Sequence, residues 1–132
     1  MQTMPGIPLI SIVDDDDALR NSLQNLVRSV GFRAQGFPSV EAFLTSNQAD
    51  ETDCLILDVR LPGTSGLELQ RQLVGGNSDV PIIFITAHED DNRRTQALQA
   101  GAVAFLYKPF YEEALLSAID AALKIRETNS SA

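Results

Sequence analysis

Polar residues that could do chemistry stand at the ends of several apolar runs of the sequence. In chain order they are Asp14, Asp15, Asp58, Thr86 and Lys108. Carboxylates that come close together repel one another unless a cation or a proton compensates them. A hard divalent ion such as Mg²⁺ prefers oxygen ligands and usually keeps coordination positions for water or a phosphoryl oxygen. If these side chains meet in the fold, they form a candidate metal site.

The same residues would suit phosphoryl transfer. With Mg²⁺ in place a carboxylate can attack a phosphorus centre without severe charge repulsion, and an aspartyl phosphate is one covalent product of such an attack. The ammonium group of Lys108 and the hydroxyl group of Thr86 are groups that can stabilise the phosphoryl oxygens. The sequence has neither a Walker loop nor the glycine fingerprint of a dinucleotide site, so nucleotide binding is not indicated.

Five apolar segments have the length and composition of β-strands, namely residues 9–13, 32–37, 54–57, 81–85 and 103–107. Three of them are almost continuously apolar, as expected of strands that are buried on both faces of a parallel sheet. The second is more polar, which suits an edge strand. Helix-length stretches separate the segments, and this alternation predicts right-handed βαβ crossovers and an open, doubly wound α/β sheet. In such a sheet, ligands bind at the carboxyl ends of the strands, where the candidate residues lie.

The helical stretches differ in how firmly they should pack. The first carries an apolar face between the Asp run and Gly31, and Ser39 is a plausible N-cap for a short second helix. A third helix, over residues 67–74, is followed by two glycines, and a fifth has apolar residues over 115–123. The fourth, over residues 91–100, has few large apolar residues, so we expect it to be loosely anchored.

Composition excludes several classes of protein. A single domain fits the 132 residues, and the net charge of −8 argues against direct nucleic-acid binding, which needs clustered Lys and Arg. No apolar stretch approaches the roughly 20 residues that span a bilayer, and the N-terminus lacks the features of a signal peptide. Together with the lone Cys54, these features predict a cytoplasmic protein without membrane association.

Simpler explanations exist for each residue taken alone. An Asp run before a helix often serves only as a cap and a dipole partner, and we assign that role to Asp16 and Asp17. Thr86 could simply finish a strand, and Lys108 could be a solvated charge. Cys54 is expected to be a buried small hydrophobe. The coincidence of the whole set at one sheet edge favours a site.

Four segments in order resemble the receiver domains of bacterial two-component response regulators. They are residues 12–16 (IVDDD), 57–63 (LDVRLPG), 84–87 (FITA) and 107–110 (YKPF). The resemblance covers residues 7–126 and leaves 127–132 as a polar tail or the start of a linker. It implies a flavodoxin-like (βα)5 fold with strand order 2-1-3-4-5.

The resemblance also implies a role for each matching residue. Asp58 resembles the phosphoacceptor, and Asp14 and Asp15 resemble the acidic pair that holds Mg²⁺ together with Asp58. Arg60 occupies the position that supplies a backbone carbonyl to the metal. Lys108 resembles the lysine that contacts the phosphoryl group.

Further positions resemble the family's switch and modulating residues. Thr86 and Phe105 match the hydroxyl and the aromatic ring that move together on activation, although Phe105 could also be plain core. The side chains of Arg60, Ala87 and His88 flank the site and could modulate the lifetime of the phosphate. The bond before Pro109 is expected to be cis.

The function implied by the resemblance is that of a signalling switch, with no catalysis beyond the domain's own phosphorylation and dephosphorylation. A sensor histidine kinase would phosphorylate Asp58, and the face built by the fourth helix, fifth strand and fifth helix would change. That face is also where two copies could form a homodimer. The segment 37–44 resembles receivers of the nitrogen-fixation class, which control transcription through a helix-turn-helix domain.

Three alternatives stay open at this stage. A phosphatase of the haloacid-dehalogenase type would use Asp14 and Asp16 as an Asp-x-Asp motif. A standalone receiver or phosphorelay module would lack an output domain, and a degenerate receiver would act only as a binding module.

Overall fold

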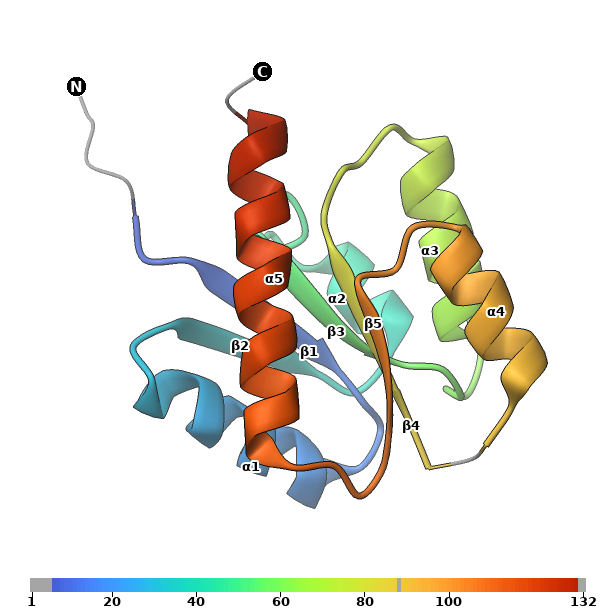
Figure 1. The fold of residues 1–132 in the computed structure, drawn as a ribbon, viewed down its shortest axis with the longest axis horizontal. Coiled ribbons are helices and arrows are strands. Elements are labelled where there is room, and N and C mark those ends of the chain that lie inside the picture. Colours follow the sequence, from blue (N-terminus) through green and yellow to red (C-terminus); the bar gives the residue numbers. More distant parts are fainter. Residues whose placement is uncertain (1–5, 88, 131–132) are drawn as a thin grey trace.

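Strands and helices alternate along the whole chain in the computed structural model, which describes residues 6–87 and 89–130 (Figure 1). The strands are β1 (Leu9–Val13), β2 (Arg33–Phe37), β3 (Cys54–Asp58), β4 (Ile82–Thr86) and β5 (Ala104–Tyr107). The helices are α1 (Asp17–Ser29), α2 (Val40–Thr45), α3 (Gly66–Gly75), α4 (Asp91–Gln99) and α5 (Glu112–Ser130). All strand pairs are parallel and the order is β2-β1-β3-β4-β5. The predicted doubly wound sheet and its strand order are thus confirmed.

The sheet separates two hydrophobic clusters. Because successive side chains of a strand point to opposite faces, Leu55 and Leu57 of β3 join one cluster and Cys54 and Ile56 join the other. Helices α2, α3 and α4 cover the first face, whereas α1 and α5 cover the second. Strands β1, β3 and β4 are buried at every position, which explains their nearly continuous apolar composition. Burial also raises the pKa of the Cys54 thiol to about 12, with a further contribution from nearby Asp53.

Side-chain caps fix where the helices begin. Asp16 accepts a hydrogen bond from the Leu19 amide at the start of α1, and Ser39 caps α2. Both caps match the sequence prediction. Helix α3 begins with a capping box, in which Ser65 accepts from the Glu68 amide and the Glu68 side chain accepts from the Ser65 amide. This box places the first turn of α3 directly after the loop that follows β3.

Helix α4 is held mainly at its C-terminal end. Ala97 is its buried residue, and the Ala97 carbonyl accepts hydrogen bonds from the Ala102 amide and from the Gln70 side chain of α3, both at 3.0 Å. The left-handed Gly101 (φ 103°) completes a Schellman motif. Residues 91–95 are exposed or half-buried, and the Asp90 side chain caps the helix by accepting from the Arg93 amide at 3.0 Å, so loose anchoring stays a prediction for this N-terminal half.

Helix α5 runs past Arg126, the expected end of the domain, and continues to Ser130. Arg126 forms an ion pair with Asp79 (2.7 Å), which ties α5 to the segment before β4. Among the described residues, no helix has the length and the hydropathy needed to cross a membrane.

Candidate functional site

The carboxyl ends of four neighbouring strands bring the candidate residues together. Asp14 follows β1, Asp58 ends β3, Thr86 ends β4 and Lys108 follows β5. The strand register places the ends of β1 and β3 side by side, and the Lys108 amide donates to the Thr86 carbonyl at 2.7 Å. Parallel strands are responsible for this meeting, because their carboxyl ends point to the same edge of the sheet.

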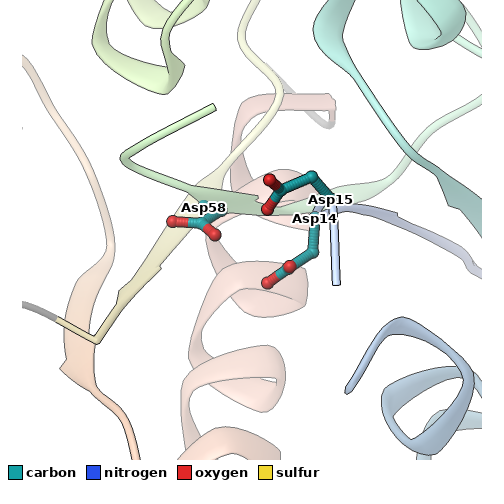
Figure 2. A group of neighbouring side chains, drawn as sticks. All are labelled: Asp14, Asp15 and Asp58. Atoms are coloured by element: carbon teal, nitrogen blue, oxygen red, sulfur yellow. The ribbon is translucent and has the colours of Figure 1, made fainter. Parts of the chain in front are cut away.

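Three carboxylates form the centre of the site (Figure 2). Asp14, Asp15 and Asp58 each offer an oxygen, and these oxygens lie within 4.8 Å of one another. Asp14 and Asp58 are buried, whereas Asp15 is exposed. Such a set of oxygen donors fits a hard divalent cation, which would offset the mutual repulsion of the carboxylates and keep open positions for water.

Lys108 provides the positive charge that the protein itself contributes. Its Nζ donates to Asp14 Oδ2 at 2.9 Å and to Asp58 Oδ2 at 3.3 Å. Burial lowers the pKa of Lys108, but its hydrogen bond to Asp14 and the charges of Asp58 and Asp14 outweigh this effect, so the net shift is upward. The raised pKa keeps the ammonium group charged at neutral pH.

The pKa of Asp58 is raised, first by burial and then by the charge of Asp14. Lys108 and the Arg60 amide, which donates to Asp58 Oδ1 at 3.1 Å, act in the opposite direction. A carboxylate held in this way keeps both oxygens in fixed positions. Without a metal ion the charged form of Asp58 is destabilised by burial and by the charge of Asp14, and a bound cation would relieve this destabilisation.

The residues expected to form the switch lie on β4 and β5, the two strands that follow β3 in the sheet. Thr86 is buried at the end of β4. Phe105 is also buried, and its ring packs against Phe84 (centroids 6.0 Å apart) and Tyr107 (5.6 Å). In this structure the ring of Phe105 therefore lies inside the protein and does not point into solvent.

The remaining predicted residues surround the site. Ala87 and Arg60 are exposed, and the Lys108-Pro109 peptide bond is cis, as the resemblance implies. Arg60 lines a cavity of about 490 Å³ together with Asp15 and Arg93 of α4. His88 lies outside the described residues.

The Asp-x-Asp alternative finds no support in this geometry. Asp16 is exposed, and its carboxylate caps α1 by accepting from the Leu19 amide. The carboxylate that does join Asp14 comes from Asp58 on a different strand. For Asp14 and Asp16 to act as a nucleophile pair, the Asp16 carboxylate would have to break its hydrogen bond with the Leu19 amide.

Two residues that lie near the site were not identified from the sequence. A Cβ atom on Gly66 would lie 2.4 Å from the main-chain oxygen of Asp58, so only glycine lets α3 begin this close to β3. The capping box at Ser65 and Glu68 marks the start of α3 in the sequence, but it does not indicate that a glycine is required at position 66. Arg20 donates from its guanidinium group to the main-chain carbonyl of Asp14 at 2.7 Å, a contact that no sequence motif announces.

Comparison with known proteins gives the same picture. The family model of the response regulator receiver domain matches residues 10–120. The chain is 49% identical over 117 residues to the response regulator protein TodT of Pseudomonas putida, covering 89% of this chain and 52% of TodT. It is 38% identical over 120 residues to the transcriptional regulatory protein FixJ of Azorhizobium caulinodans, covering 91% of this chain and 57% of FixJ.

A solved structure agrees in fold as well as in sequence. The response regulator StyR superposes with a TM-score of 0.88 at 43% identity, covering 96% of this chain and 64% of StyR. The chain thus spans about half the length of the curated relatives it matches. The likeness to FixJ agrees with the predicted similarity to regulators of the nitrogen-fixation class. Family model, relatives and fold together show that the chain belongs to the receiver domains of response regulators.

Proposed function

We propose that Asp58 accepts a phosphoryl group from a sensor histidine kinase in the presence of Mg²⁺. The observation that supports this proposal is the position of the Asp58 carboxylate, which lies beside Asp14 and Asp15 and also contacts Lys108. Asp14, Asp15, Asp58 and the main-chain carbonyl of Arg60 would hold the cation. When bound, Mg²⁺ would neutralise the negative charge of the transferring phosphoryl group.

The protein's own groups divide the remaining tasks. An oxygen of Asp58 attacks phosphorus, the bond from phosphorus to the histidine nitrogen breaks, and its electron pair returns to the imidazole ring. Lys108, already within 3.3 Å of the Asp58 carboxylate, would contact one phosphoryl oxygen, and the Thr86 hydroxyl group would donate a hydrogen bond to another. These contacts stabilise charge that develops only in the transition state and the product. Hydrolysis of the aspartyl phosphate would return the domain to its resting state, and Arg60, Ala87 and His88 would influence its rate.

The signal would leave through the face formed by α4, β5 and α5. Movement of Thr86 toward the phosphoryl group would favour one arrangement of Phe105 and of the N-terminal half of α4, whose side chains are exposed or half-buried. The same face would support a homodimer. FixJ is named a transcriptional regulatory protein, and we propose that the parent protein of this chain is likewise a cytoplasmic transcriptional regulator. Its receiver would extend over residues 7–126, and residues 127–132 would begin the linker to a DNA-binding domain.

Phosphorylation with acetyl phosphate tests this proposal. Wild-type protein should acquire a hydroxylamine-sensitive phosphate that depends on Mg²⁺, and Asp58→Asn should acquire none. Asp16→Asn, which changes only the helix cap, is the matched control and should be labelled like the wild type. Absence of labelling in the wild type would indicate a degenerate receiver. Turnover of a phosphate ester that survives Asp58→Asn but not Asp14→Asn would indicate a phosphatase.

A further inference from the structure

Asp14 is held at each of its polar atoms. Its amide donates to the Phe37 carbonyl at 3.1 Å, and its Oδ1 accepts from the Asp16 amide at 2.8 Å. Its Oδ2 accepts from Lys108 Nζ at 2.9 Å, and its carbonyl accepts from Arg20 Nη1 at 2.7 Å. The side chain of Asp14 is therefore fixed by groups other than Arg20, so the contact with Arg20 must serve another part of the turn.

The Asp14 carbonyl belongs to the peptide unit that joins Asp14 to Asp15. A hydrogen bond to this carbonyl fixes the plane of that peptide and, with it, the direction in which the Asp15 side chain leaves the backbone. In the described part of the chain the Asp15 carboxylate accepts no hydrogen bond of its own, and it is exposed. Its position beside Asp14 and Asp58 consequently depends on the backbone of the turn, and Arg20 contributes the hydrogen bond to the Asp14 carbonyl of that backbone.

Other elements hold Arg20 in place for this contact. Its side chain is only 14% exposed, and its second guanidinium nitrogen pairs with Asp17 in the first turn of α1. The stem passes over Gly36 of β2, where an added Cβ would lie 2.9 Å from Arg20 Cγ and 2.2 Å from Gln24 Nε2. Gly36 thus leaves the space that the Arg20 stem needs. The guanidinium charge by itself would oppose a nearby cation, so a loss of Mg²⁺ affinity on its removal would report the contact with the Asp14 carbonyl and not the charge.

We infer that Arg20 is a positioning residue of the metal site, which orients the Asp15 carboxylate by holding the Asp14-Asp15 peptide. This inference rests on the proposed function, because it requires that the acidic cluster binds Mg²⁺. Outer contacts of this kind change metal affinity by roughly tenfold or more when they are removed. Without the guanidinium group, the Asp14-Asp15 peptide rotates more freely, and Mg²⁺ binding must fix it.

Calorimetric titration with Mg²⁺ tests the inference. Arg20→Ala should raise the dissociation constant for Mg²⁺ by roughly tenfold, and Arg20→Lys should recover part of the loss because one donor can still reach the carbonyl. Labelling by acetyl phosphate should return close to the wild-type rate at saturating Mg²⁺, since Asp58 and Lys108 are untouched. Amide hydrogen exchange should be faster in Arg20→Ala at Asp16, whose amide donates to Asp14 Oδ1.

Arg28→Ala is the matched control, because Arg28 lies on the same helix and donates to the Ala34 carbonyl at 2.9 Å, away from the site. It should lose a similar amount of thermal stability and keep its Mg²⁺ affinity. Equal Mg²⁺ affinity in wild type and Arg20→Ala would overturn the inference, as would an equal loss in Arg28→Ala. If the wild type itself bound no Mg²⁺, the proposed function would fail instead.

Discussion

Asp58→Asn should make the metal-free protein more stable at neutral pH, although it removes the residue on which the function depends. An Asp58 oxygen lies within 4.8 Å of oxygens of Asp14 and Asp15. At an effective dielectric constant of about 20, two unit charges at that distance repel by about 3.5 kcal/mol, and the pair with Lys108 at 3.3 Å attracts by about 5 kcal/mol. The two repulsions together exceed the attraction, and burial of Asp58 adds to the cost.

Solvent screens exposed Asp15, which brings the repulsion and the attraction close to balance, so the burial of Asp58, the largest cause of its raised pKa, decides the sign. We expect the free energy of unfolding to rise by about 1–2 kcal/mol, which corresponds to roughly 4 °C in Tm for each kcal/mol in a domain of this size. The asparagine can still accept the hydrogen bond from the Arg60 amide, and Lys108 keeps Asp14. Urea unfolding without divalent ions measures the change. Asp120→Asn on the exposed surface of α5 is the control, with an expected change within about 0.5 kcal/mol.

The stability difference between Asp58→Asn and the wild type should depend on pH. The pKa of Asp58 is raised in the folded state, so the folded protein binds more protons than the unfolded chain between the two pKa values. Stability is then lost as the pH rises through the folded pKa. The advantage of Asp58→Asn should therefore be largest at neutral pH and should shrink at acidic pH, where wild-type Asp58 is protonated. A destabilised Asp58→Asn, or a gain that stays constant with pH, would refute the electrostatic account.

Other perturbations probe separate parts of the structure. Lys108→Ala should abolish labelling by acetyl phosphate. It should also lower the free energy of unfolding of the metal-free protein by roughly 2 kcal/mol or more, because two buried carboxylates lose their cation. Urea unfolding with and without Mg²⁺ measures this loss, and an unchanged free energy of unfolding would contradict the prediction. Gly66→Ala should cost about 2 kcal/mol or more, because its Cβ would meet the Asp58 carbonyl; the midpoint of urea unfolding measures the loss, with Gly75→Ala, where nothing lies within 4 Å, as the control. Gln70→Leu should release the C-terminal end of α4 by removing the donor to the Ala97 carbonyl; amide hydrogen exchange should then accelerate in α4 but not in α1, and equal protection would show that the Schellman motif alone holds the helix.

The parallel α/β sheet and the centre of the site could be predicted from local patterns of the sequence, whereas the strand order came from the resemblance to receiver domains. Apolar runs that alternate with helical stretches specify a parallel sheet, and a parallel sheet brings Asp14, Asp58 and Lys108 to one edge regardless of the loops between them. Asp16 was correctly assigned to the helix cap because caps depend on neighbouring residues alone.

Features that depend on tertiary distances could not be predicted in this way. The Arg20 contact joins a long side chain to a backbone carbonyl, so it leaves no pattern of residue types. The need for glycine at position 66 arises from the approach of α3 to the end of β3. Helix α5 passes Arg126 although its last residues are polar, since helical propensity and the ion pair with Asp79 can extend a helix beyond its apolar face.

Chemical mapping of the phosphorylated residue tests the central claim most directly. After reaction with acetyl phosphate, borohydride reduces an aspartyl phosphate to homoserine, which mass spectrometry of the digested protein can locate. We predict homoserine at position 58, and only in samples that contained Mg²⁺ during the reaction. Homoserine at position 14 or 15, or labelling at position 58 that does not need a divalent ion, would contradict the claim that the carboxylate cluster holds a cation beside a nucleophilic Asp58.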